Sequence, residues 1–172
     1  PTEYLFEGFI GGFMQSVLNE HAKVKLQASE LSLVDDIDFG GRSYGKAFAM
    51  RHDILVEHKE KGLFVFDTKY KMLSRFSENS ELKKSIVNDV SQNDLYQVRE
   101  YALRRGLTKA YLLYPLFCKE ALEDGNVTLK GSIIVEDKTH PVDVHLVRMP
   151  FIFEDDVEET KLKLTSVIEG LF

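Results

Sequence analysis

The chain has 172 residues, of which 44% are hydrophobic and 29% are charged, and its formal net charge is −6. This composition indicates a globular domain with a buried core, and it excludes a disordered or fibrous chain. The acidic balance argues against a protein that coats DNA passively, because such binding requires an excess of Lys and Arg at the contact surface. Every apolar stretch is far shorter than the roughly 20 residues of a membrane span, so we expect no membrane-spanning segment.

The chain contains one cysteine, Cys118. A single cysteine excludes an internal disulfide and a cysteine-based zinc site, and it suits the cytoplasm. The apolar neighbours Leu116 and Phe117 favour a buried structural thiol. The sequence begins at Pro1 without an initiator methionine or a signal-peptide pattern. We therefore expect residues 1–172 to form a single domain, the C-terminal part of a longer protein.

Apolar residues recur at helical spacing in the first part of the chain and predict an amphipathic helix over residues 2 to about 20, with Thr2 as its cap. Residues 24–28 alternate as a short strand. The polar stretch that follows leads into Gly40 and Gly41 and predicts a turn. Residues 47–57 and 62–71 are then expected to form a strand pair, joined by a charged turn.

Residues 73–90 are polar, mix both charges and show no clear period, so we expect a loop. A helix then runs from a Ser91 cap to Arg105 and stops at Gly106. Residues 109–115 predict a buried strand, residues 127–136 with 142–150 a further strand pair, and residues 155–171 a closing amphipathic helix. This order favours an α/β fold in which helices flank a mixed central sheet.

The most informative segment is LFVFDTKYK, residues 63–71. Side chains two apart on a strand share a face, so Asp67 and Lys69 are presented together. A second acid, Asp53, lies in the apolar run MRHDILV. Two carboxylates and a lysine suit metal-assisted phosphodiester cleavage, in which Mg²⁺ activates water and neutralises charge on the phosphate. An Asp-x-Lys triplet also occurs by chance on solvated strands, and Asp53 has the alternative of capping a turn or pairing with Arg51.

The segments MRHDILV, LFVFDTKYK and DLYQVREYALRRGLTKAYLLYP, in this order and at these gaps, resemble the PD-(D/E)XK nuclease superfamily. Within it the chain is most similar to the nuclease domains of McrC type, from Tyr4 to Pro115. The resemblance implies a restriction-endonuclease-like fold. It also implies that Asp53, Asp67, Lys69 and Glu7 are catalytic, and that Asp53, Asp67 and Glu7 bind Mg²⁺, with Mn²⁺ as a substitute.

Two residues outside the strands complete the resemblance. Gln97 and Tyr101 lie four apart on one helical face and match the Gln-x-x-x-Tyr motif of RecB-like members, which shapes the site and contacts DNA. From the residues alone, Tyr101 is equally a core aromatic and Gln97 a surface amide. Glu7 stands beside Phe6 in an apolar stretch, where a carboxylate is costly unless it meets a cation or donor. Its alternative is a solvated position on the helix surface.

The sequence departs from the family pattern at two positions. His52 stands where Pro often precedes the first acid, and Asp67 stands where many members have Glu; neither change removes a group that the chemistry requires. We expect His52 to pack or to lie at the surface. Some basic residues after the strand and on the helix are candidates for contacts with DNA, although ordinary solvation explains any single one: Lys71, Arg75, Lys83, Lys84, Arg99, Arg104 and Arg105. Glu100 and Arg104 are spaced for an ion pair on the helix.

The resulting functional hypothesis is a Mg²⁺-dependent DNA endonuclease of an McrBC-like restriction system that serves in antiviral defence. The resemblance implies DNA and a GTP-driven AAA+ motor subunit of McrB type as partners, and it allows a homodimer for double-strand cleavage. The glycine-rich segment GFIGGF lacks the Lys-Ser/Thr of a phosphate-binding loop, so it does not predict nucleotide binding. Two alternatives stay open: a catalytically inactive nuclease-fold module for DNA binding or assembly, and a different metal-dependent hydrolase using the same acids.

Overall fold

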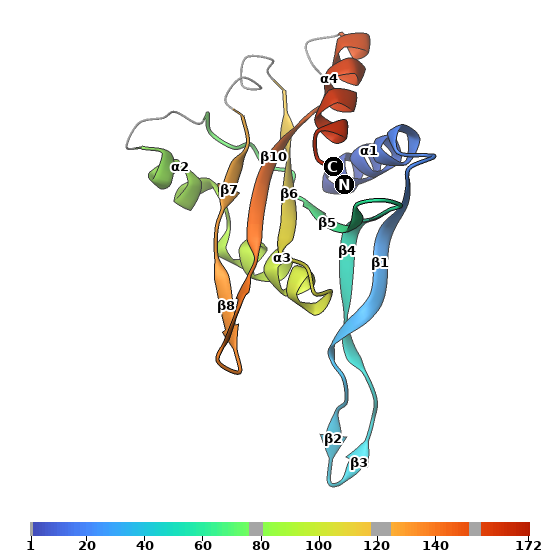
Figure 1. The fold of residues 1–172 in the computed structure, drawn as a ribbon, viewed down its shortest axis with the longest axis vertical. Coiled ribbons are helices and arrows are strands. Elements are labelled where there is room, and N and C mark those ends of the chain that lie inside the picture. Colours follow the sequence, from blue (N-terminus) through green and yellow to red (C-terminus); the bar gives the residue numbers. More distant parts are fainter. Residues whose placement is uncertain (1, 76–80, 118–124, 152–155) are drawn as a thin grey trace.

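The computed structural model describes residues 2–75, 81–117, 125–151 and 156–172 (Figure 1). Its centre is a six-stranded sheet with the strand order β1-β4-β5-β6-β10-β7. The strands of this sheet are β1 (Ala22–Val34), β4 (Ala47–His58), β5 (Gly62–Thr68), β6 (Lys109–Leu116), β10 (Asp143–Pro150) and β7 (Val127–Leu129). Two short hairpins add β2 (Asp38–Phe39) with β3 (Arg42–Ser43), and β8 (Ser132–Val135) with β9 (Lys138–Pro141). The helices are α1 (Thr2–Val17), α2 (Leu82–Asp89), α3 (Gln92–Arg104) and α4 (Val157–Glu169).

The sheet is mixed. Strands β5, β6 and β10 run parallel, whereas β1 with β4, β4 with β5, and β10 with β7 are antiparallel. Helices cover the sheet, so the prediction of a mixed α/β fold is confirmed. Since parallel neighbours end at the same edge, the carboxyl ends of β5 and β6 lie together, and this edge holds the site described below.

Strand β6 shows how the two faces of the sheet differ. Its residues are almost all buried, as expected for a central strand covered on both faces. Tyr111 and Leu113 point into a cluster built with α1 and α4, while Leu112 and Tyr114 point into a second cluster built with α2 and α3. The alternation along one strand therefore supplies two cores from successive residues.

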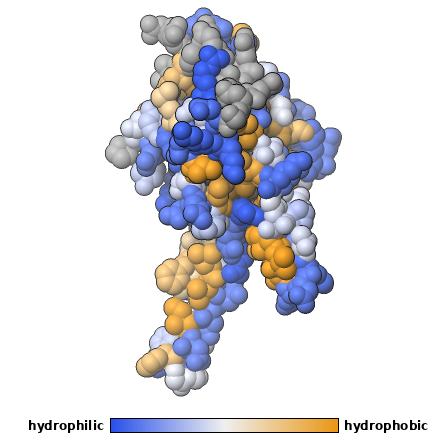
Figure 2. Space-filling view, turned by 90° about the vertical axis from the view of Figure 1, so that its left-hand side faces the viewer, coloured by the Kyte–Doolittle hydropathy of each residue, from blue (hydrophilic) through white to orange (hydrophobic). Residues whose placement is uncertain are grey.

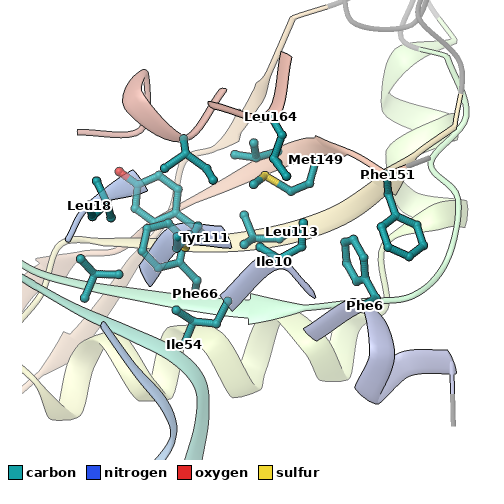
Figure 3. Close-up of a cluster of buried hydrophobic side chains, with 14 of the residues drawn as sticks. Phe6, Ile10, Leu18, Ile54, Phe66, Tyr111, Leu113, Met149, Phe151 and Leu164 are labelled. Carbon is teal, nitrogen blue, oxygen red and sulfur yellow. The ribbon is translucent and has the colours of Figure 1, made fainter. Parts of the chain in front are cut away.

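The larger core lies between the sheet and the helices α1 and α4 (Figure 3). Phe6 of α1 meets Phe151 edge to face with ring centroids 5.3 Å apart, and Phe66 of β5 lies 4.8 Å from the ring of Tyr111. Fully burying such side chains stabilises the fold by about 1.5–3 kcal/mol each. This packing fixes α1 against β5, and thereby fixes the position of Glu7 relative to Asp67.

Strands β1 and β4 continue beyond the core as a two-stranded projection that ends in β2 and β3 (Figure 1). We call residues 29–49 the arm. The pairing of β1 with β4 changes register between Ala28 and Leu31, where the arm begins. Figure 2 shows hydrophobic patches on the surface of the arm. The large side chains exposed along the arm are Leu33, Ile37, Phe39, Tyr44 and Phe48. The turn at its tip is made by Gly40 and Gly41, both at positive φ, so the predicted turn is confirmed.

Several sequence-based predictions need correction. The strand expected at residues 24–28 extends to Val34. The prediction was too short because β1 is an edge strand with both faces partly solvated, and such a strand shows no clean alternation of apolar and polar residues. The loop expected at residues 73–90 contains α2, whose Leu82 and Ile86 form an apolar stripe among charged residues. The strand pair expected at residues 127–150 is interrupted by the hairpin of β8 and β9.

The helix boundaries agree more closely with expectation. Thr2 is the first residue of α1 rather than its cap, and the helix ends at Val17. Ser91 flanks α3 with extended backbone but without a side-chain cap, and Gly106 ends it at positive φ. Cys118 lies outside the described residues. No helix in the described part of the chain is long and apolar enough to cross a membrane.

Candidate active site

The candidate site begins where β4 and β5 separate. Their antiparallel register continues from His58 opposite Gly62 to Ile54 opposite Phe66, so Asp53 and Asp67 are the next facing positions. There a side chain replaces the regular backbone partner: Oδ2 of Asp53 accepts hydrogen bonds of 2.8 Å from both the backbone N–H and the hydroxyl of Thr68. The Asp53 carboxylate thereby stands between the two strand ends. We call this place the fork.

Asp67 and Lys69 form an ion pair at the fork. Asp67 is 1% exposed, and Nζ of Lys69 lies 2.6 Å from its Oδ2. The pair is held by β6, because the backbone N–H of Lys69 donates to the carbonyl of Leu113 over 2.8 Å. Oδ2 of Asp67 is buried and faces that ammonium, and because a carboxylate oxygen carries two lone pairs it can accept a second partner from the site.

Lys69 lowers the pKa of Asp67, and Asp67 raises the pKa of Lys69, but burial acts on both groups as well. Burial, together with the nearby charge of Asp53, raises the pKa of Asp67 from 3.8 to about 7 despite the attraction of Lys69. Burial opposes the charge of Lys69, but its attraction to Asp67, Asp94 and Asp53 outweighs burial and raises the pKa of Lys69. The fork thus concentrates negative charge in a place with little water, which is the setting in which a cation binds strongly.

Helix α1 supplies a third carboxylate. Glu7 is buried, which excludes the solvated helix-surface position, and its Oε1 accepts a hydrogen bond of 3.0 Å from Gln27 of β1. Burial and the charge of Asp53 raise the pKa of Glu7, partly offset by Gln27 and Arg51. A surface hollow of about 200 Å³ is lined by all three acids and their neighbours: Glu3, Tyr4, Glu7, Asp53, Asp67, Thr68, Lys69, Tyr70 and Gln97.

Helix α3 contributes the remaining predicted residues. Gln97 lines the hollow, and its Oε1 accepts a hydrogen bond of 3.4 Å from Nζ of Lys69. Its amide group also donates to the hydroxyl of Tyr101 over 2.7 Å, and that hydroxyl donates to the carbonyl of Arg51 over 2.9 Å. Tyr101 is therefore a core aromatic with a satisfied hydroxyl, and it connects Gln97 to the backbone of β4 beside Asp53.

His52 faces away from the hollow. It is fully buried, its ring lies 4.4 Å from that of Tyr101, and burial lowers its pKa. Nδ1 lies 3.1 Å from the carbonyl of Ala28, and Nε2 accepts a hydrogen bond from Arg105. These partners fit a neutral ring that donates from Nδ1. The prediction that His52 packs is confirmed.

The basic residues divide into different environments. Arg104 pairs with Glu100 at 2.9 Å, which confirms the expected ion pair on α3. Arg105 pairs with His52 and lies 3.4 Å from Glu30, and Arg99 lines a separate hollow. Lys71 lies near the site, where it pairs with Asp94 at 2.9 Å.

Sequence reasoning missed three residues that hold the site together. Thr68 binds Asp53, Gln27 binds Glu7, and Asp94 lies 3.4 Å from Nζ of Lys69 and 2.9 Å from Nζ of Lys71. The position of Asp94, three residues before Gln97 on one helix face, was a signal that could have identified it. The partner of Thr68 depends on strand register and that of Gln27 on how α1 packs on β1, and no local sequence pattern reports either.

The donor set of the hollow fits a hard divalent cation. Asp53, Asp67 and Glu7 offer carboxylate oxygens, and Mg²⁺ needs only one or two carboxylates because it retains several water ligands. The buried Oδ2 of Asp67 is an acceptor that such a cation would satisfy. In the described ranges no group of three or more His, Cys, Asp or Glu side chains lies close enough to hold a metal ion, so a cation here would rely on one or two carboxylates and water.

Fold and site together define a class of protein: a mixed α/β domain with an open, carboxylate-rich hollow at the carboxyl end of β5. The chain belongs to the family described as McrBC 5-methylcytosine restriction system component, whose model matches residues 1–115. All six residues singled out in the sequence fall within the matched range: Glu7, Asp53, Asp67, Lys69, Gln97 and Tyr101.

A solved structure supports the fold over nearly the whole chain. It is the half-complex from a tetradecameric assembly of Thermococcus gammatolerans McrB AAA+ hexamers with bound McrC. One of its chains is similar with a TM-score of 0.56 at 14% identity, and the match covers 99% of this chain. The chain spans about a third of the length of that protein, since 33% of it is covered. A comparison with proteins of curated function gave no match.

Proposed function

We propose that this chain is the nuclease domain of an McrBC-type restriction component and a member of the PD-(D/E)XK superfamily. It hydrolyses phosphodiester bonds in DNA with Mg²⁺. The observation that carries the proposal is the fork: Asp53 and Asp67 occupy facing positions on two strands, and Lys69 pairs with Asp67 in the same hollow. Family membership over residues 1–115 supports it independently of this geometry.

Each residue of the hollow has a role that its position suggests. Asp53 and Asp67, with Glu7, would hold Mg²⁺, which would supply an activated water and neutralise charge on the phosphate. Lys69 lies where it orients that water and stabilises charge that develops in the transition state. Gln97 limits the movement of Lys69, and Tyr101 holds Gln97.

The proposal includes partners. DNA is the substrate, and an AAA+ GTPase of McrB type is the motor that brings DNA to the site. The similar structure of McrB AAA+ hexamers with bound McrC supports such an assembly. Because one hollow cuts one strand at a time, cleavage of both strands would use two copies of the domain.

The experiment that tests the proposal uses the full-length protein with its McrB-type partner, GTP and methylated plasmid DNA. We expect Mg²⁺-dependent cleavage that falls about 100-fold or more in Asp53→Asn, Asp67→Asn and Lys69→Ala, since each removes a group acting on the reacting atoms. Asp38→Asn and Lys46→Ala, exposed changes of the same charge types in the arm, serve as controls and retain activity.

Calorimetry with Mn²⁺ separates the nuclease from an inactive nuclease-fold module. We expect binding in the wild-type protein and loss of binding in the double variant Asp53→Asn, Asp67→Asn. Binding that is unchanged in that variant, together with cleavage that survives in all three single variants, would reject the assignment. Parallel assays with RNA and small phosphoesters identify a different metal-dependent hydrolase.

A further inference from the structure

Asp94 lies at the edge of the hollow between two lysines. It belongs to the first turn of α3, and its side chain is 18% exposed. Its two carboxylate oxygens have different partners: Oδ1 lies 3.4 Å from Nζ of Lys69, and Oδ2 lies 2.9 Å from Nζ of Lys71. An acid in a first turn commonly serves only to stabilise the helix dipole. A carboxylate directed at two ammonium groups requires a further explanation.

The ammonium of Lys69 has three anchors. Asp67 is the nearest at 2.6 Å, and Asp94 and Oε1 of Gln97 follow at 3.4 Å each. Asp67 is also the acid whose buried oxygen suits a cation, so the proposed function gives one carboxylate two competing partners. When a divalent cation occupies Asp67, the ammonium is repelled by that cation and loses its closest anchor.

Asp94 is placed to hold Lys69 under that condition. It approaches the ammonium from α3, whereas Asp67 approaches from β5. Its charge also reaches Asp67, where it contributes to the raised pKa of that acid. The Gln97 amide, being neutral, cannot replace the attraction that Asp67 loses to the cation. Lys71, on the outer oxygen of Asp94, fixes the carboxylate in its orientation.

We propose that Asp94 is a positioning residue that keeps the ammonium of Lys69 at the hollow while a divalent cation is bound to Asp67. The proposal rests on the proposed function, because it requires a cation at Asp67. It assigns Asp94 no contact with substrate or metal: Asp94 acts through Lys69. Loss of its charge should therefore impair the chemical step more than the binding of DNA or cation.

The direct test is nitrogen-15 NMR of lysine ammonium groups in the full-length protein, with the Lys69 signal identified by its absence in Lys69→Arg. We expect the signal to persist when Mg²⁺ is added to the wild-type protein and to disappear when Mg²⁺ is added to Asp94→Asn. A Lys69 signal that responds to Mg²⁺ equally in both proteins would overturn the proposal.

Kinetics with the McrB-type partner provide the second readout. We expect Asp94→Asn to lower kcat about tenfold with a change in KM below about twofold, and Asp94→Glu to restore most of the activity. Glu158→Gln, which removes an acid from the first turn of α4, controls for a helix-dipole effect and leaves kcat unchanged. A loss confined to KM, or to melting temperature, would overturn the positioning role.

Mn²⁺ calorimetry distinguishes the failure of this proposal from the failure of the proposed function. We expect Asp94→Asn to bind Mn²⁺ as the wild-type protein does. If Asp94→Asn abolishes binding, Asp94 is a metal ligand and the positioning role is wrong while the nuclease assignment stands. If the wild-type protein binds neither Mg²⁺ nor Mn²⁺, the proposed function fails and this proposal fails with it.

Discussion

The fork and the arm contain the same hydrogen-bond arrangement in opposite surroundings. At the fork, one oxygen of Asp53 accepts from the hydroxyl and the backbone N–H of Thr68, each at 2.8 Å. In the arm, one oxygen of Asp36 accepts from the hydroxyl of Ser43 at 2.6 Å and from the N–H of Gly45 at 2.7 Å. Local geometry therefore does not distinguish the candidate site from an ordinary surface turn.

The difference lies in what surrounds the two carboxylates. Asp36 is exposed, and the hydrogen bonds that it accepts from Ser43 and Gly45 lower its pKa. Asp53 faces a second acid, Asp67, whose pKa is raised mainly by burial. In the arm, hydrogen bonds at the solvent-exposed surface stabilise the charged form of Asp36. At the fork, burial disfavours the charged form of Asp67. An acid whose pKa stays raised by burial although a lysine pairs with it is the kind of perturbed group that gathers at functional sites.

The largest expected effect comes from removing the buried charge of the fork. Because Asn imitates the protonated acid, Asp67→Asn should stabilise the fold above pH 7. A pKa that rises from 3.8 to about 7 on folding means that the native state binds more protons in this window, so stability falls as pH rises through it. The gain is on the order of 4 kcal/mol at pH 8 and vanishes below about pH 4. Urea unfolding from pH 4 to pH 8 measures it.

The matched change in the arm is Asp38→Asn, which also neutralises an aspartate but at an exposed position. We expect no pH-dependent gain in stability between pH 4 and pH 8 for this variant. If the free energy of unfolding depends on pH equally in Asp38→Asn and Asp67→Asn, then burial at the fork does not disfavour the charged form of Asp67. The physical distinction between the fork and the arm would then be lost.

The second prediction deletes the same hydroxyl in each region. Thr68→Val removes the side-chain donor to Asp53, and Ser43→Ala removes the donor to Asp36. At the partly buried fork the change should cost about 1.5 kcal/mol of stability and, if the proposed function holds, lower cleavage about tenfold. In the arm, water replaces the lost hydroxyl, so neither the melting temperature nor cleavage changes. Comparable losses in both variants would contradict the comparison.

The sequence was sufficient to predict the main residues of the fork but not the contacts that hold them in place. The apolar run before Asp67 and the two-residue step to Lys69 are local patterns that predicted the pairing of the two side chains, although β5 ends at Thr68 and Lys69 lies just beyond the strand that was expected to reach residue 71. The hydrogen bonds of Asp53 with Thr68 and of Glu7 with Gln27 span 15 and 20 residues. The first exists only once β4 has paired with β5, and the second only once α1 has packed against β1. Helix packing and strand register, rather than any motif, decide which acids meet.

The outer part of β1 and the helix α2 were missed for a different reason. Residues 29–34 lie on an edge strand whose side chains are mostly accessible, so no alternation of apolar and polar residues was selected there. In α2 the apolar positions Leu82 and Ile86 are too few to produce a clear period within a charged segment. Burial imposes the patterns that sequence reasoning detects, and these segments are little buried.

The third prediction concerns the hydroxyl that joins Gln97 to the backbone beside Asp53. Tyr101→Phe leaves the carbonyl of Arg51 without its donor and should destabilise the fold by about 1 kcal/mol, as measured by urea unfolding. Tyr44→Phe removes an exposed hydroxyl from the arm and should leave stability unchanged. Destabilisation by Tyr44→Phe that matches or exceeds that of Tyr101→Phe would mean that the arm is more constrained than its exposure indicates.

The smallest expected effect comes from removing most of the arm. Ser32 faces Ala49, so an Asn-Gly turn in place of residues 33–48 closes the hairpin without altering the buried Met50 or the fork. The deletion removes exposed side chains such as Phe39 and Phe48 and one bond from Arg104 to the carbonyl of Leu33, so the melting temperature should change by less than about 2 °C. Calorimetric scanning of both proteins measures the change. A fall of more than about 5 °C would show that the arm stabilises the rest of the domain. Its exposed aromatic side chains would then contribute to folding stability.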